Sequence, residues 1–298
     1  MKTPKRIEPL VEAGLVDEVL RSLMSGKEAA VYVVRCGDQL RCAKVYKEAN
    51  KRSFRQASEY QEGRKVRNSR QARAMLKGSK FGRKETEDAW QNAEVAALFR
   101  LAAAGVRVPK PYDFLDGVLL MELVADEDGD AAPRLTDVKM DADQAREYHA
   151  FLINQVVLML CAGLVHGDLS EFNVLLCPDG PVIIDLPQAV DAAGNNHAFN
   201  MLERDVGNMA LYFGRFAPEL RASKYAKEMW ALYEAGTLHP GSLLTGEFDE
   251  PEEEADVDGV IREIEAARLD DERRQIGRAE VEAPPKKSAE PPPPPWMQ

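Results

Sequence analysis

The most constraining feature of this sequence is a polar loop between apolar segments near the middle of the chain. The loop is His166–Asn173, with Gly163–Val165 before it and Val174–Leu176 after it. A further apolar run, Val182–Ile184, leads directly into Asp185. Short apolar runs separated by polar residues predict strands joined by loops, so we expect an acidic side chain at the end of a β-hairpin beside this loop.

The side chains of the loop are those that phosphoryl transfer requires. Asp168 follows His166 by two positions, and Asn173 follows Asp168 by five. Phosphoryl transfer depends on positioning and charge neutralisation, for which carboxylates, an amide and Mg²⁺ suffice. Asp168 is the candidate to orient a hydroxyl and accept its proton, while Asn173 and Asp185 offer the oxygen ligands that Mg²⁺ prefers. An ordinary polar loop is the alternative, but it would not need this combination.

Length and composition fit a globular protein of two lobes with tails. The chain has 298 residues, 45% of them hydrophobic, and a formal net charge of −11, which argues against a surface that binds nucleic acid everywhere. The first residues carry acids where a signal peptide needs an apolar run, and the longest apolar run, Val156–Val165, is too short to span a bilayer. We therefore expect a cytoplasmic protein that does not enter a membrane. Four cysteines match no zinc spacing and are expected to be reduced core residues: Cys36, Cys42, Cys161 and Cys177.

A lysine within a predicted strand marks the first half of the chain. Apolar residues at helical spacing predict a helix over Ile7–Leu23, and later a strand over Leu40–Tyr46 contains Lys44. A lysine is unfavourable in a strand unless something compensates its charge, as nucleotide phosphates and a glutamate would. Glu94, on a helix predicted over Glu85–Ala104, is the candidate partner, and Glu87 and Asp88 on the same helix are the alternatives.

The segment Lys47–Lys84 is dense in lysine and arginine and contains few acids. Contacts with RNA phosphates need only clustered positive charge, so rRNA or another polyanion is a candidate partner. The favoured alternative is a solvated helical face, because only Phe54, Tyr60 and Phe81 offer aromatic stacking.

A hairpin predicted across Asp116-Gly117 ends in a candidate hinge between the lobes. Its second strand finishes with Met121, Glu122 and Val124. The backbones of Glu122 and Val124 are candidates to hydrogen-bond an adenine edge at this point.

The second half of the chain is predicted to be helical and then polar. Apolar residues predict helices over Asp143–Leu160 and near Phe199–Phe213. The first of these helices is expected to pack beneath His166–Asn173, the candidate catalytic loop. Acids fill Asp249–Asp258, and prolines fill Pro291–Pro295. Such segments cannot build a core, so we expect the last forty or so residues to be largely disordered.

Taken together, these motifs resemble the RIO family of atypical serine kinases and ATPases over about residues 15–235. The matching segments are Ser25–Tyr32, Ala43–Lys47, Ala89–Glu94, Ala132–Leu135, His166–Asn173 and Asn196–Asn208. The resemblance implies an α+β, two-lobed protein-kinase-like fold with a small β-rich N-lobe, a mostly helical C-lobe, and ATP between them. The expected divisions are an N-terminal helix over 1–23, an N-lobe over 24–124 with a basic insert over 47–84, a C-lobe over 125–247, and a tail over 248–298.

The resemblance also implies a role for each site residue and for the cofactors ATP and Mg²⁺ or Mn²⁺. Asp168 is implied to be the catalytic base, Asn173 and Asp185 the metal ligands, Lys44 and Glu94 the phosphate-positioning pair, and the loop with Ser25 and Lys27 a substitute for a Gly-rich loop. The implied activity is that of a serine/threonine protein kinase or ATPase. The resemblance also implies transient phosphorylation of Asp185, as in RIO proteins that act as ATPase switches in small-ribosomal-subunit maturation. A protein substrate or this particle is therefore the expected partner.

The short segment before Ser25 is similar to the RIO1-like branch, because the RIO2-like branch has an N-terminal winged helix. Gly167 and Leu186-Pro187 depart from the family pattern. Two other functions stay open. One is a small-molecule phosphotransferase similar to aminoglycoside or choline kinases, which share the His-Gly-Asp-Leu pattern. The other is a module that binds pre-ribosomal RNA or protein through Lys47–Lys84 and uses ATP only as a structural ligand.

Overall fold

The computed structural model describes residues 3–26, 29–47 and 80–249, although residues 80–90 are described by their backbone alone. All of these residues except Asp249 belong to one compact unit, which ends at Phe248. Three subjects of the sequence analysis lie outside them: Lys27, the basic segment between residues 48 and 79, and the acidic and proline-rich tail from residue 250.

The N-lobe is built on a five-stranded antiparallel sheet with the strand order β1-β2-β3-β5-β4. Its strands are β1 Glu18–Ser25, β2 Ala29–Cys36, β3 Gln39–Tyr46, β4 Pro111–Leu115 and β5 Val118–Glu122. The turn between β4 and β5 is the predicted Asp116-Gly117, and both residues have positive φ (49° and 74°). Positive φ at both central residues matches the right-handed twist of a hairpin. The register places Lys44 of the central strand β3 opposite Val31 and Leu119.

The predicted N-terminal helix over Ile7–Leu23 is wrong. The helix α1 covers only Glu8–Glu12, and Glu18–Ser25 forms the edge strand β1 paired with β2. Gly14, with φ of 70°, lies between the two elements. The apolar residues that suggested one helical face instead pack into a small core with the sheet, where α1 contributes Leu10 and β1 contributes Val19. The predicted boundary at residue 23 therefore cuts through a strand of the N-lobe.

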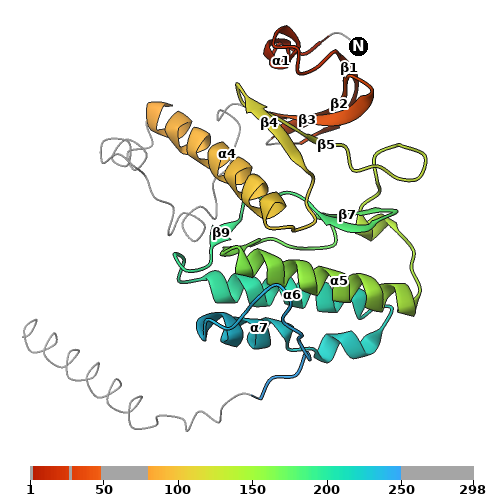
Figure 1. Ribbon diagram of the computed structural model, residues 1–298, viewed down its shortest axis with the longest axis vertical. Helices are drawn as coiled ribbons and strands as arrows, with labels where there is room; N and C mark the ends of the chain where they lie inside the picture. The colour runs from red at the N-terminus through yellow and green to blue at the C-terminus, as the bar shows by residue number, and fades with distance from the viewer. Residues whose placement is uncertain (1–2, 27–28, 48–79, 250–298) are drawn as a thin grey trace, which may run out of the picture. The chain divides into compact units, whose positions relative to one another are not determined.

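The helix α4, Lys80–Ala103, contains the helix predicted from residue 85 and begins five residues earlier. Figure 1 shows it beside the sheet. Val95, Leu98 and Leu101 pack in the larger core that also contains Leu119 of β5. Gly105 follows the helix with φ of 81°, a conformation that suits a glycine after a helix end.

The C-lobe combines two short two-stranded sheets, β6-β9 and β7-β8, with three α-helices below them in the view of Figure 1. Its elements are η2 Leu135–Asp137, α5 Ala142–Cys161, β6 Leu164–Val165, β7 Val174–Cys177, β8 Gly180–Ile183, β9 Val190–Asp191, α6 Ala198–Phe213, η3 Pro218–Ala222 and α7 Tyr225–Glu234. The side chain of Asp141 accepts the Gln144 N–H at 2.9 Å and starts α5 with a capping box. The predicted helices over 143–160 and 199–213 are thus present, and the α+β, two-lobed fold is confirmed.

The four cysteines are all free thiols, but they do not share the core position expected for them. Cys42 and Cys177 are buried, Cys36 is half-buried, and Cys161 is exposed at the end of α5. Among the described residues, no helix is both long and apolar enough to cross a membrane.

Candidate active site

A cleft of about 640 Å³ lies between the sheet of the N-lobe and the hairpin that follows the catalytic loop. Val31 of β2 and Met121 of β5 line one side, and Leu175 of β7 lines the other. Charged and polar side chains also line this mostly apolar space: Lys44, Glu94, Asn173 and Asp185. Apolar walls with a few convergent polar groups are typical of a small-molecule site.

Lys44 links the two lobes at this cleft. Its Nζ lies 2.5 Å from Glu94 Oε1 on α4 and 3.3 Å from Asp185 Oδ1 of the C-lobe. Burial of the ammonium opposes its charge, but the nearby Glu94 and Asp185 carboxylates outweigh this effect and raise the pKa of Lys44 above its ordinary value. The predicted pairing of Lys44 with Glu94 is therefore present, and Lys44 is kept as a cation in the cleft.

The candidate catalytic loop, His166–Asn173, is held by hydrogen bonds within the loop and by one contact with Ile184. The buried imidazole of His166 lies 3.1 Å from the Ile184 carbonyl through Nε2, and its Nδ1 accepts the Asp168 N–H at 3.2 Å. Asn173 Nδ2 donates to the Asp168 carbonyl at 2.7 Å. Because Asn173 uses its nitrogen in this bond, its side-chain oxygen is the atom suited to a cation.

Asp205 of α6 anchors the same loop from below. Its buried carboxylate accepts the Gly167 N–H at 2.7 Å and the Leu169 N–H at 3.0 Å, on either side of Asp168. Burial raises the pKa of Asp205 to about 6, against the lowering effect of nearby His166 and of these N–H donors. The sequence pattern Leu202–Asn208 pointed to this helix without assigning Asp205 a role.

Two neighbours on α6 complete the support of the loop. Asn208 Nδ2 donates to the Leu169 carbonyl at 3.0 Å, and the Arg204 guanidinium donates to the Gly167 carbonyl. Residues 204, 205 and 208 lie on adjacent turns of one helix, so a single rigid element fixes the backbone around Asp168.

Asp185 has a left-handed backbone, with φ of 66°, two residues after β8 ends at Ile183. This conformation is uncommon for an aspartate and costs free energy that the surrounding structure must supply. The Ile184 N–H donates to the Asn173 carbonyl at 2.9 Å, which joins the two candidate metal-binding segments. The amide oxygen of Asn173 and the half-exposed carboxylate of Asp185 both line the cleft, and together they form a hard oxygen donor set that fits Mg²⁺.

Comparison with known proteins identifies the kind of domain that carries this site. A family model described as a RIO domain matches residues 30–227. The chain is 38% identical over 215 residues to the RIO-type serine/threonine-protein kinase Rio1 of Haloferax volcanii, which covers 70% of this chain and 68% of that protein. The chain belongs to the RIO family.

Further RIO relatives support the same branch. The chain is 33% identical to Rio1 of Methanocaldococcus jannaschii over 66% of this chain and 63% of that protein, and 31% identical to human RIO1 over 69% of this chain and 35% of that protein. It thus spans only about a third of the human relative. The family and these names confirm the predicted RIO1-like recognition and the enzyme class, a serine/threonine-protein kinase. They favour this class over a small-molecule phosphotransferase. Such a kinase uses a nucleotide and a divalent metal, which the donors described above suit.

The residues predicted to form the hinge lie at and just after the end of β5, Val118–Glu122. Met121, Glu122 and Val124 all line the cleft. The Glu122 N–H donates to the Lys110 carbonyl at 2.8 Å, and the Val124 carbonyl accepts the Ala132 N–H at 2.9 Å. The groups that these bonds do not use, the Glu122 carbonyl and the Val124 N–H, are therefore the candidates for an adenine edge.

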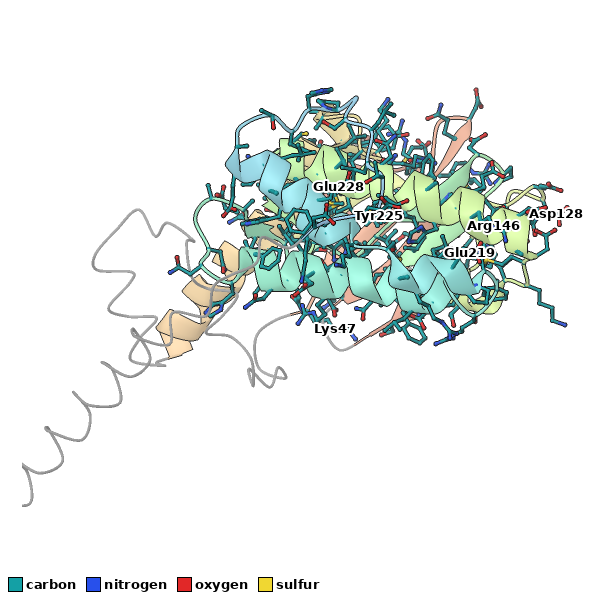
Figure 2. The ribbon with its side chains drawn as sticks, turned by 90° about the horizontal axis from the view of Figure 1, so that it is seen from below. Lys47, Asp128, Arg146, Glu219, Tyr225 and Glu228 are labelled. Atoms are coloured by element: carbon teal, nitrogen blue, oxygen red, sulfur yellow. The ribbon has the colours of Figure 1, made fainter. Side chains whose placement is uncertain are left out.

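The loop after β1 is held by a lysine that sequence reasoning did not assign to the site. Lys47 Nζ donates to Ser25 Oγ at 3.0 Å and to the Gly26 carbonyl at 2.6 Å. Figure 2 labels this lysine. Of the two residues predicted from this loop, Ser25 is thus tied to the end of β3, and Lys27 lies outside the described residues. The role of Ser25 stays a prediction.

Proposed function

We propose that this RIO domain transfers the γ-phosphate of ATP, with Mg²⁺ or Mn²⁺, to a protein serine or to water. The observation that carries the proposal is the link from Glu94 through Lys44 to Asp185 inside the cleft, at 2.5 and 3.3 Å. The Lys44 ammonium, held between two carboxylates, is in place before ATP binds. It can therefore bind the phosphates without reorganisation of the site.

The proposed reaction gives each site residue a role. Lys44 binds the phosphates, and Glu94 keeps its ammonium oriented toward them. Asn173 and Asp185 would hold the divalent cation, which neutralises charge on the phosphates when bound. Asp168, on the loop anchored by Asp205, accepts the proton of the attacking hydroxyl.

Two acceptors fit this arrangement. In a kinase reaction, a serine oxygen bonds to the γ-phosphorus, the bond to ADP breaks, and Asp168 takes the serine proton. In an ATPase reaction, an Asp185 carboxylate oxygen attacks instead and ADP leaves. Water then attacks the acyl phosphate, which releases inorganic phosphate and restores Asp185. The half-exposed carboxylate of Asp185 at the cleft supports the second route as well.

One labelling experiment tests the proposal and separates the routes. The full chain is incubated with γ-labelled ATP and Mg²⁺, beside Asp168→Asn and Asp185→Asn, and the labelled protein is treated with hydroxylamine. Hydroxylamine cleaves an acyl phosphate and leaves phosphoserine intact. Label that is removed and is absent from Asp185→Asn supports the ATPase route, whereas stable label that is lost in Asp168→Asn supports the kinase route. No label on any protein, together with no release of labelled phosphate, would overturn the proposal.

We further propose a cytoplasmic location and a partner that is a protein or the small ribosomal subunit with its rRNA. The support is the charge of Lys47–Lys84 and the family resemblance. The variant Arg64→Glu/Lys65→Glu/Arg67→Glu should weaken binding to small-subunit rRNA and reduce its salt dependence, while Asp168→Asn leaves binding unchanged. Equal binding by the charge-reversed and unaltered chains would argue against this contact. Loss of function only on charge reversal, and not in Asp168→Asn, would instead favour a binding module.

A further inference from the structure

Arg107 makes a two-pronged ion pair with the hinge residue Glu122. Its Nη1 lies 2.9 Å from Glu122 Oε2, and its Nη2 lies 2.9 Å from Oε1. The Lys110 N–H also donates to Oε2, at 2.9 Å. Both side chains are mostly buried, with 28% and 27% exposed. Paired hydrogen bonds between a planar guanidinium and a carboxylate fix rotation as well as distance, so the Glu122 side chain has one defined orientation.

The backbone of Arg107 is attached to the C-lobe. Its N–H donates to Oε1 of the buried Gln155 on α5 at 2.7 Å. Its carbonyl accepts the Ile183 N–H at 3.0 Å. Ile183 ends β8, two residues before Asp185. A single residue between α4 and β4 thus joins the hinge to the elements that carry the catalytic machinery.

The charges of the pair persist although the site is partly buried. Burial alone would raise the pKa of the Glu122 carboxyl, but hydrogen bonds from Arg107 and from the Lys110 N–H hold it below its ordinary value. Glu122 is therefore ionised at neutral pH. Because its oxygens are already occupied, the side chain is suited to holding the hinge in place rather than to binding the nucleotide.

We propose that Arg107 is a positioning residue for recognition of the adenine base. By fixing Glu122, it sets where the Glu122 carbonyl and the nearby Val124 N–H face the cleft. Two hydrogen bonds to one edge of a base distinguish adenine from guanine only while their spacing is maintained. This inference rests on the proposed use of ATP, and it concerns the base rather than the phosphates, which lie toward Lys44.

Binding measurements on the full chain test the inference. Isothermal titration compares adenosine, ATP with Mg²⁺ and GTP with Mg²⁺ on the unaltered chain and on Arg107→Met. The affinities for adenosine and ATP should both fall about ten-fold, equivalent to the loss of about 1.4 kcal/mol, and the preference for ATP over GTP should shrink. The KM for ATP should rise by a similar factor, while kcat at saturating ATP stays within about two-fold.

Two further variants separate positioning from folding. The exchange Arg107→Glu/Glu122→Arg keeps an ion pair and should recover most of the base preference. Arg146→Met removes an exposed ion pair with Glu219 at 2.6 Å, whose members are labelled in Figure 2, and should leave all three affinities unchanged. Thermal unfolding of each variant, followed by circular dichroism, shows whether it is folded at the titration temperature.

The outcomes distinguish this inference from the proposed function. Failure of the unaltered chain to bind ATP would overturn both. ATP binding by the unaltered chain, with an unchanged preference for ATP over GTP in folded Arg107→Met, would overturn only the inference. A ten-fold loss of affinity for ATP in Arg107→Met, without a loss of affinity for adenosine, would also contradict the inference. The defect would then lie in binding of the phosphates rather than of the base. If Arg107→Met does not fold, failure of the folded exchange variant to prefer ATP would overturn it.

Discussion

The Asp205 carboxylate lies 2.7 Å from the backbone nitrogen of Gly167, the residue before the candidate base. Its second oxygen accepts the Leu169 N–H, so one buried side chain spans the backbone on both sides of Asp168. The position of Asp168 therefore depends on a residue that itself has no part in the chemistry.

Replacing Asp205 by Asn should disturb this anchor. The side-chain amide of asparagine has only one oxygen that can accept a hydrogen bond. The N–H of either Gly167 or Leu169 would therefore face the NH₂ group of Asn, which is itself a donor. Hydrogen bonds to charged groups contribute about 1.5–3 kcal/mol each, and we expect the free energy of unfolding at pH 8 to fall by about 2 kcal/mol. Loss of this bond should shift the backbone around Asp168, so kcat should also fall. Urea unfolding and steady-state phosphate release measure the two effects.

Asp191 provides a matched control. Its Oδ1 also accepts two backbone N–H groups, from Ala193 at 3.1 Å and Gly194 at 3.0 Å, but on an exposed turn. Water can replace those bonds, so Asp191→Asn should change stability and kcat little. If Asp205→Asn and Asp191→Asn changed stability and kcat equally, the bonds made by Asp205 would not specifically hold the backbone around Asp168.

A second prediction separates charge positioning from folding at Lys44. Lys44→Met leaves the Glu94 carboxylate buried without its cation, which should lower the free energy of unfolding by about 3 kcal/mol. The double variant Lys44→Met/Glu94→Leu removes the stranded charge and should regain most of that stability. Both variants should lose about 100-fold in kcat, because the phosphates lose a preorganised positive partner. Phosphate release measures kcat, and urea unfolding measures stability.

The decisive result is the activity of the double variant. A stable double variant with nearly unaltered kcat would show that Lys44 and Glu94 have only a structural role. A stable and inactive one supports the role proposed for Lys44.

The residues around the catalytic loop could be predicted because their chemistry and spacing are local. The loop His166–Asn173 and the strand before Asp185 are adjacent in the sequence, and the structure brings them together as expected. Lys44 and Glu94 are fifty residues apart, yet a lone lysine in a strand needs a carboxylate, which α4 supplies.

Other features depend on contacts that leave no local trace. The apolar residues of β1 fit helical spacing and therefore predict a helix, whereas pairing with β2 decides the conformation of this segment. Asp205 holds the catalytic loop, and Arg107 joins the hinge to the C-lobe, through hydrogen bonds to backbone groups. To predict these roles, one must know which backbone groups lie nearby in space. Sequence spacing does not provide this information for residues that are separated by tens of positions.

A third prediction concerns pH and the buried His149 of α5. Its ring lies 5.7 Å from that of Phe213 and 5.8 Å from that of Tyr225, and burial lowers the pKa of His149 to about 4. In the unfolded chain a histidine binds a proton near pH 6.5, so between pH 6.5 and 4 the unfolded state binds more protons than the folded state. Stability must therefore fall as the pH falls through this window, by up to about 3 kcal/mol from this group.

The variant His149→Phe lacks this contribution. The free energy of unfolding, measured by urea at pH 7 and pH 4.5, should fall less for His149→Phe than for the unaltered chain. His239→Phe, at an exposed position, should follow the unaltered chain. If His149→Phe lost as much stability on acidification as the unaltered chain, the ring would not be a buried neutral imidazole.

The last prediction concerns how residues 245–246, which follow α7, are fixed to that helix. The Glu228 carboxylate accepts the Thr245 N–H at 2.8 Å, the Gly246 N–H at 2.8 Å and the Thr245 hydroxyl at 3.1 Å. A Cβ on Gly246 would lie 2.9 Å from the Tyr225 ring, so the backbone approaches the helix closely here. Figure 2 shows Glu228 and Tyr225 near each other. This carboxylate is therefore the main polar attachment of residues 245–246.

Glu228→Ala should release this segment without affecting the cleft. Opening of a segment exposes its backbone to proteases, so chymotrypsin should cleave after Phe248 several-fold faster, while phosphate release stays unchanged. Glu234→Ala, at an exposed position at the end of the same helix, should leave the cleavage rate as it is. Unchanged cleavage in Glu228→Ala would show that the remaining contacts fix the segment, among them the bonds from Lys224 to the Gly246 carbonyl at 2.7 Å and the Phe248 carbonyl at 3.1 Å. Loss of activity in the same variant would instead show that α7 and the segment it holds influence the catalytic loop through α6, against which α7 packs.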